Sequence, residues 1–327
     1  MKKITLILAS VLLIISCDKA PKKRSLKFSS GRVNHVNVVI AKEQWQGQIG
    51  DVLREILAAP VDGLPQEEPL FTLKQIPEEA FTGFARENRT FIQISKTDSI
   101  GVRIAHNIYA RPQTGIVISG TSENEISELI EQRAEDIIKA LKTQELEADQ
   151  KRISKSLKSD QGLREQLGIR LKFPTAYRYA KDEDGFFWMR KPLSNGDMNI
   201  LVYEVPLKVI DQDTNTVARL VRMRDSIGGR HVPVDEGRFI TERAFAPLVF
   251  ETKIDGKFTW LTKGTWEVEG QRMAGPFVNY AILDEANGRY LVIEGFIFSP
   301  SLDKRDNMFE LEAIIKSATF IQDQSIN

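Results

Sequence analysis

The sequence predicts an α+β protein with two domains, each a mainly antiparallel sheet with helices packed on it, joined by a long helix. Short runs in both halves of the chain are rich in β-branched and alternating apolar residues, which is typical of strands. In the second half, Asp255-Gly256 and Asn287-Gly288 each separate two such runs. This is the strongest local signal of a β-hairpin. Between the halves, residues 121–160 show helical apolar spacing that fades into a charged stretch.

The composition excludes several classes of protein. The 327 residues suffice for two domains, and 42% hydrophobic with 28% charged residues is typical of globular chains. Basic and acidic residues both number 45, so the basic excess of a nucleic-acid binder is lacking and we expect no nucleic-acid partner. The single cysteine cannot form an internal disulfide or supply a multi-thiolate zinc site.

Residues 1–16 have the pattern of an export signal. Lys2 and Lys3 precede an apolar run that ends at Ile15. As a helix this run extends only about 18 Å, against about 30 Å of hydrocarbon in a bilayer, so it fits a signal peptide and not a spanning anchor. The following Ser16-Cys17 resembles the end of a bacterial lipobox. We therefore expect cleavage before Cys17 and acylation, including palmitate, of its thiol.

An acylated Cys17 makes a membrane the first expected partner, because two or three acyl chains form a durable anchor. Residues 17–32 are polar and contain Pro21, which favours a flexible tether. The resulting localisation is the cell envelope, with the periplasmic face of the outer membrane favoured over the inner membrane.

The N-terminal domain is predicted to cover residues 33–120. A short β-branched run at 33–40 and helical spacing at 49–57 come first, and several strands follow. One strand alternates apolar residues with His106, so we expect this histidine to be a buried core residue.

The connecting helix is predicted over residues 121–160. Ser122 followed by Glu125 is a capping-box signature at its start. Charges and glutamines dominate from Glu145 to Asp160, so we expect the second half of this helix to be exposed to solvent.

The C-terminal domain is predicted over residues 161–327, as an antiparallel sheet with helices over one side. The four runs around the two hairpin signals form a meander. Asn307 with Glu310 indicates the start of a last helix with one apolar face.

Several segments resemble an uncharacterised family of Bacteroidetes envelope lipoproteins, catalogued as domain of unknown function 4837. The resemblance spans nearly the whole mature chain and implies an envelope lipoprotein, without an activity, ligand or catalytic residue. The segments that carry it are Ser29 to Arg32, Trp45 to Arg54, Pro60 to Gln66, Arg224 to Gly228 and Glu294 to Phe296.

The densest polar segment surrounds the glycine pair Gly228-Gly229. Arginine forks clamp anionic groups, a histidine between carboxylates can act as a base, and adjacent glycines admit a partner closely. The alternative is a helix that ends at the glycines, followed by a solvated loop. The candidate binding patch consists of Arg222, Arg224, Asp225, Arg230, His231 and Glu242.

The motifs favour a non-enzymatic envelope module that binds or scaffolds other envelope proteins or an envelope ligand. The second hypothesis is an envelope hydrolase that uses carboxylates and His231 near the glycine pair. We predict no catalytic residue, no metal site and no cofactor, because nucleotide-binding loops, serine-hydrolase elbows and spaced histidine ligands are missing from the sequence.

Overall fold

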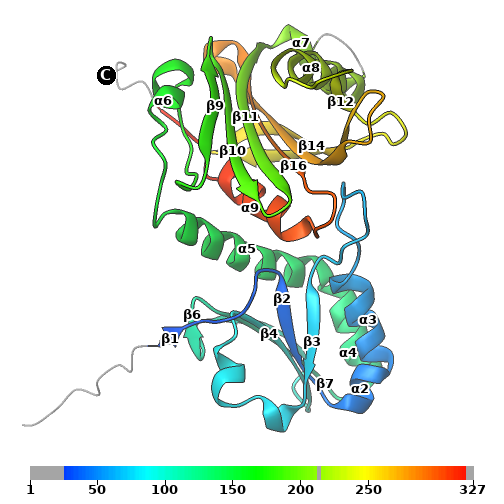
Figure 1. Cartoon of the computed structure of the whole chain (residues 1–327). Helices are drawn as coiled ribbons and strands as arrows, with labels where there is room; N and C mark the ends of the chain where they lie inside the picture. Colours follow the sequence, from blue (N-terminus) through cyan, green and yellow to red (C-terminus); the bar gives the residue numbers. More distant parts are fainter. Residues whose placement is uncertain (1–25, 212–214, 322–327) are drawn as a thin grey trace, which may run out of the picture.

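The computed structural model describes residues 26–211 and 215–321. Cys17, the signal peptide and most of the tether lie outside this range. Figure 1 shows two sheet-containing halves, one above the other, with a long helix between them. The α+β class predicted from the sequence is confirmed.

The N-terminal sheet has five strands, and most of its pairings are parallel. Here the structure differs from the expected antiparallel pattern; only the pairing of β5 with β7 is antiparallel among these described strands. Helix α3 (Gln48–Leu57) follows β2 and returns the chain so that β3 runs parallel to β2. The strands in sheet order are β3 (Thr72–Ile76), β2 (His35–Val39), β4 (Thr90–Lys96), β7 (Thr114–Gly120) and β5 (Gly101–His106).

A core of aliphatic side chains lies between this sheet and its helices. Short helix α2 (Lys42–Gln46) leads into α3, whose buried Ile49, Leu53 and Leu57 face the sheet. The first strand in the described residues, β1 (Lys27–Phe28), pairs in parallel with β6 (Ala110–Arg111).

The connection between the halves is two helices, α4 (Glu123–Gln132) and α5 (Ala134–Ile153), which meet at Arg133. The capping prediction is confirmed, since Ser122 Oγ accepts a hydrogen bond from the Glu125 amide. The expected exposure of the second half is correct for only one face of α5, where Glu147, Lys151 and Arg152 are exposed. On the other face, Glu145, Asp149 and Ile153 are buried where α5 packs against α9 (Arg305–Ile315).

The C-terminal sheet has eight strands, and every pairing described is antiparallel, as predicted. Both hairpin predictions are confirmed: Asp255-Gly256 joins β13 to β14 with positive φ at both residues, and Asn287-Gly288 lies between β15 and β16. The strands in sheet order are β12 (Phe239–Thr241), β14 (Lys257–Val268), β15 (Ala274–Asp284), β16 (Arg289–Phe298), β11 (Gly196–Pro206), β10 (Phe186–Leu193) and β9 (Arg178–Glu183), with β13 (Leu248–Ile254) paired to β14.

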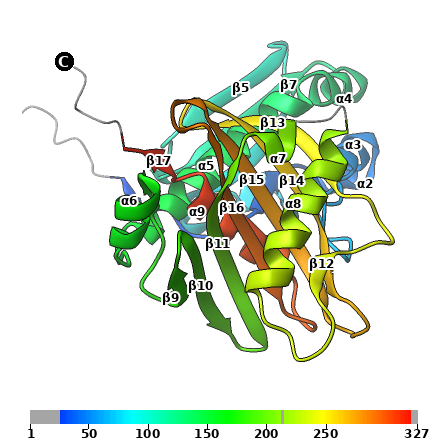
Figure 2. The ribbon, with the colours of Figure 1, turned by 90° about the horizontal axis from the view of Figure 1, so that it is seen from above.

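Helices cover both faces of this sheet, not one. Alternate strand residues enter two separate cores, one under α9 and α6 (Gln161–Leu167), the other under α8 (Thr216–His231). Figure 2 shows α8 and the short α7 (Lys208–Asp211) along one side of the sheet. At the sheet's end, β8 (Ile169–Arg170) pairs with β17 (Thr319–Phe320).

Candidate functional site

Five of the six residues predicted as a binding patch lie on α8, which continues through the glycine pair to His231. The structure explains why residues 228 and 229 are glycines, which the sequence did not reveal. A Cβ on Gly228 would lie 2.7 Å from the Phe239 ring, and one on Gly229 would lie 2.8 Å from the Arg238 guanidinium. The close approach is therefore between α8 and the chain at β12, and it does not leave the glycines open to a partner.

Arg224 is a core residue, only 2% exposed. Its guanidinium pairs with Glu294 at 2.9 Å and lies 3.8 Å from the centre of the Phe277 ring. It also donates a hydrogen bond to Thr241 Oγ1, which in turn donates to Asp225. The structure thus brings Arg224 and Asp225 together, but as an internal network that fastens α8 to the sheet.

The other predicted patch residues do not converge. Arg222 and Arg230 are exposed, and Glu242 is half-buried. The His231 ring stacks on Phe186, with centroids 4.2 Å apart. Burial, then repulsion from Lys181 and Arg230, lowers the pKa of His231, which favours the neutral ring. Among the described residues, no carboxylate is hydrogen-bonded to this ring.

At the junction between the two halves, a residue of the N-terminal half caps a helix of the C-terminal half. Helix α9 has no side-chain cap of its own at Lys304. Instead, Glu68 of the N-terminal half accepts hydrogen bonds from the backbone amides of Lys304 (2.7 Å) and Arg305 (2.8 Å). The carboxylate satisfies two orphan amides and complements the positive end of the helix dipole. Asn34 adds a hydrogen bond to Asp306 at 3.0 Å.

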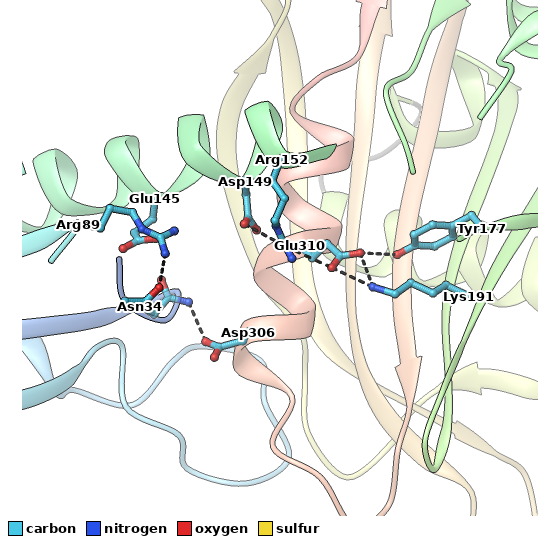
Figure 3. A network of polar contacts seen from close by, with 10 residues as sticks. Asn34, Arg89, Glu145, Asp149, Arg152, Tyr177, Lys191, Asp306 and Glu310 are labelled. Atoms are coloured by element: carbon cyan, nitrogen blue, oxygen red, sulfur yellow. Dashed lines mark hydrogen bonds and ion pairs between the residues drawn. The ribbon is translucent and has the colours of Figure 1, made fainter. Parts of the chain in front are cut away.

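Buried carboxylates on α5 and α9 extend this junction, as Figure 3 shows. Arg89 pairs with Glu145 at 3.1 Å, and Lys191 pairs with Glu310 at 2.7 Å. Burial raises the pKa of Glu145 to about 7, against the opposing effect of Arg89. Burial also raises the pKa of Asp149.

A groove runs between α5 and the strands β5 and β6, with a volume of about 720 Å³. The α5 positions that line it extend from Asp136 to Lys151, about 22 Å of helix at 1.5 Å per residue. His106 lies on its opposite wall. This residue is exposed, so its predicted burial is wrong, and its Nδ1 contacts Thr114 Oγ1 at 3.1 Å.

The groove carries an excess of positive charge. Arg133 is paired with Asp136 at 2.7 Å. Arg111, Lys139 and Lys151 have no ion-pair partner within the part of the chain that the structure describes. The carboxylate of Glu147 offsets only part of these three positive charges, so the groove favours an anionic ligand.

The sequence contains a pattern that reflects this groove, but the pattern also fits a helix face exposed to solvent. Lys139, Thr143, Glu147 and Lys151 recur every four residues, which places them on one helix face. A polar stripe of this kind also covers any solvated helix. The second wall, which makes it a groove, comes from strands about 30 residues earlier.

Within residues 26–211 and 215–321, no group of three His, Cys, Asp or Glu side chains is placed to hold a metal ion. In the same ranges, no helix combines the length and apolar character needed to cross a membrane.

The structure is a two-domain α+β chain with a cationic groove, and family comparisons divide the chain close to the end of α5. Residues 156–317 belong to the family described as domain of unknown function DUF4837. Residues 29–154 match a second domain of unknown function, DUF8532. The single resemblance seen in the sequence therefore corresponds to two catalogued domains.

Curated proteins give no match to the chain. Among solved structures, the cyanobacterial PsbP protein of Synechocystis sp. is 12% identical, covering 50% of this chain and 92% of its own, with a TM-score of 0.33. The Ran-binding protein Mog1p of Saccharomyces cerevisiae is 11% identical, covering 47% and 91%, with a TM-score of 0.33. LpqN of Mycobacterium tuberculosis, involved in cell envelope biogenesis, is 11% identical, covering 46% and 82%, with a TM-score of 0.29. Likenesses this weak carry no functional inference.

Proposed function

We propose that this chain is a non-enzymatic module, anchored in the cell envelope through lipid on Cys17, that binds an extended acidic segment of another envelope protein. The observation that carries the proposal is the groove along α5, with Arg111, Lys139 and Lys151 left without counter-ions. An opening that follows about 22 Å of helix is shaped for an extended chain more than for a compact small molecule.

The hydrolase hypothesis finds no comparable support. A general base must reach the proton that it removes and must be oriented by a third group. His231 is stacked on Phe186, and Asp225 is engaged by the Thr241 amide at 2.7 Å and hydroxyl at 2.8 Å. These residues act in packing α8 against the sheet.

Site-specific crosslinking in cells tests the groove. A photoreactive residue at Glu147, which is exposed and lines the groove, should form an adduct with a partner protein. The double change Arg111→Ala and Lys151→Ala should reduce that adduct about fivefold, because both side chains are exposed and each ion pair with the partner contributes about 0.5 kcal/mol.

The matched control uses the patch predicted on α8. A photoreactive residue at exposed Ser226 should give no specific adduct, and Arg222→Ala with Arg230→Ala should leave the Glu147 adduct unchanged. The reverse pattern, with adducts at Ser226 that need Arg222 and Arg230, would transfer the binding surface to α8 and contradict the proposal.

The lipid anchor is tested separately. In the producing bacterium, Cys17→Ser should abolish metabolic labelling with palmitate and leave the precursor uncleaved, because the modified thiol is lost. Labelling of the serine variant, or a mature N-terminus at another residue, would overturn the anchor without affecting the groove.

A further inference from the structure

A second hollow, of about 300 Å³, lies on the other side of α5, where the two domains meet. Its walls come from the loop after α3, from α5, and from β14 with α9. Gly63 in that loop approaches β14 closely: its φ is +79°, and a Cβ would lie 2.9 Å from Lys263 Cβ. The apolar part of the wall consists of Val61, Leu70, Leu146, Leu261, Met308 and Phe309.

The polar part of this hollow is cationic. Lys263 and Lys316 share one carboxylate, Glu312, at 2.9 Å and 3.5 Å. Lys139 and Lys142 also line the hollow, and neither has an ion-pair partner among the residues that the structure describes. Two of the four lysines therefore lack an ion-pair partner beside an apolar wall; Lys139 also lines the groove, whereas Lys142 lines this hollow and not the groove.

The pKa shifts of Lys142 and Glu312 agree with an excess of positive charge in this hollow. Removal from water, and then repulsion from Lys263, lowers the pKa of Lys142. Burial alone would raise the pKa of Glu312, but Lys263, Lys316 and Lys142 lower it to about 2. Glu312 thus stays ionised at neutral pH, and an added anion would relieve the remaining repulsion between the lysines.

We infer that the hollow binds a phosphate monoester with a short apolar group, and that this ligand bridges the two domains. A phosphate monoester carries about −1.5 to −2 charges near neutral pH, which suits a hollow where four lysines share the Glu312 carboxylate. Its apolar group lies against Leu146, Leu261 and Phe309. A volume of about 300 Å³ is at the lower end of small-molecule pockets and suits such a ligand. The anion comes either from a lipid headgroup or from a soluble organic phosphate.

Isothermal titration calorimetry of the full chain with hexyl phosphate tests this inference. Hexyl phosphate should bind more tightly than inorganic phosphate, which lacks the apolar group, and more tightly than hexanol, which lacks the charge. Lys142→Gln should weaken binding at least about tenfold, since a charge-assisted contact is lost. Bound ligand should raise the melting temperature of the wild type, as expected for binding to the folded state.

The control variant is Lys96→Gln, at an exposed lysine outside the hollow, which should bind like the wild type. Equal binding by Lys142→Gln, equal affinity for inorganic phosphate, or no binding of hexyl phosphate by folded wild type would each overturn the inference. Vesicles with and without phosphatidic acid distinguish the sources. A Lys142-dependent preference for phosphatidic acid assigns a lipid headgroup, whereas hexyl phosphate binding without that preference assigns a soluble phosphate.

Discussion

Replacing Arg224 with alanine is expected to lower the free energy of unfolding by about 3–5 kcal/mol, the usual cost of breaking a buried ion pair. The substitution leaves the Glu294 carboxylate, itself 1% exposed, without its cation in the core under α8. It also removes the guanidinium from the Phe277 ring and from Thr241. Urea denaturation followed by circular dichroism measures the change.

Two comparisons separate the ion pair from other effects of the mutation. Arg222→Ala, on the exposed side of the same helix, should change stability by less than about 0.5 kcal/mol. The double variant Arg224→Met, Glu294→Gln removes both charges and keeps an acceptor for Asn279, which donates to Glu294 at 2.9 Å. It should recover more than half of the loss. A loss below about 1 kcal/mol for Arg224→Ala would contradict a buried pair.

The stability of the domain junction is expected to fall as pH rises from about 4.5 to 7, because of Glu145. The pKa of this carboxyl is raised to about 7 by burial, from an ordinary value of 4.5. In that window the unfolded chain has already released the proton, whereas the folded chain retains it. The unfolded state therefore binds fewer protons, and stability decreases with pH by up to about 3 kcal/mol.

Glu145→Gln isolates this effect, since glutamine keeps the shape and cannot ionise. Denaturation of wild type and variant at pH 4.5, 5.5, 6.5 and 7.5 should give a difference in unfolding free energy that moves steadily in favour of the variant. Carboxyls remote from Glu145 contribute equally to both proteins and cancel, whereas Asp149 is electrostatically coupled to Glu145 and does not cancel completely. A difference that stays constant with pH would mean that Glu145 does not titrate in this range.

Much of the C-terminal fold could be predicted because its signals are local. Asp255-Gly256 by itself favours a tight turn. In the connecting helix α4, the capping pair Ser122 and Glu125 likewise acts within one helical turn. The parallel pairing of β2 with β3 and β4 depended on where α3 returns the chain, which no short segment encodes. The start of α9 was predicted at Asn307 and lies at Arg305, because the residue that caps it is Glu68, more than 200 residues earlier.

The candidate site was harder to predict than the fold. Charge density around Gly228-Gly229 indicated a surface patch, but density in sequence does not reveal which side chains point inward. Arg224 is drawn into the core because Glu294, Thr241 and two aromatic rings provide partners there. The lysines of α5 looked like ordinary solvated residues, since the walls that place them in hollows come from distant strands and from the other domain.

The pairing of β1 with β6 limits how far the groove can be from a membrane. Lys27 lies beside Ala110, next to the groove residue Arg111. Lys27 is ten residue steps from Cys17, and a fully extended chain spans at most about 3.6 Å per step, or about 36 Å in all. With lipid on Cys17, a partner can reach the groove only in a shallow layer above the bilayer. Proteins that are themselves embedded in or attached to that membrane are held within this layer.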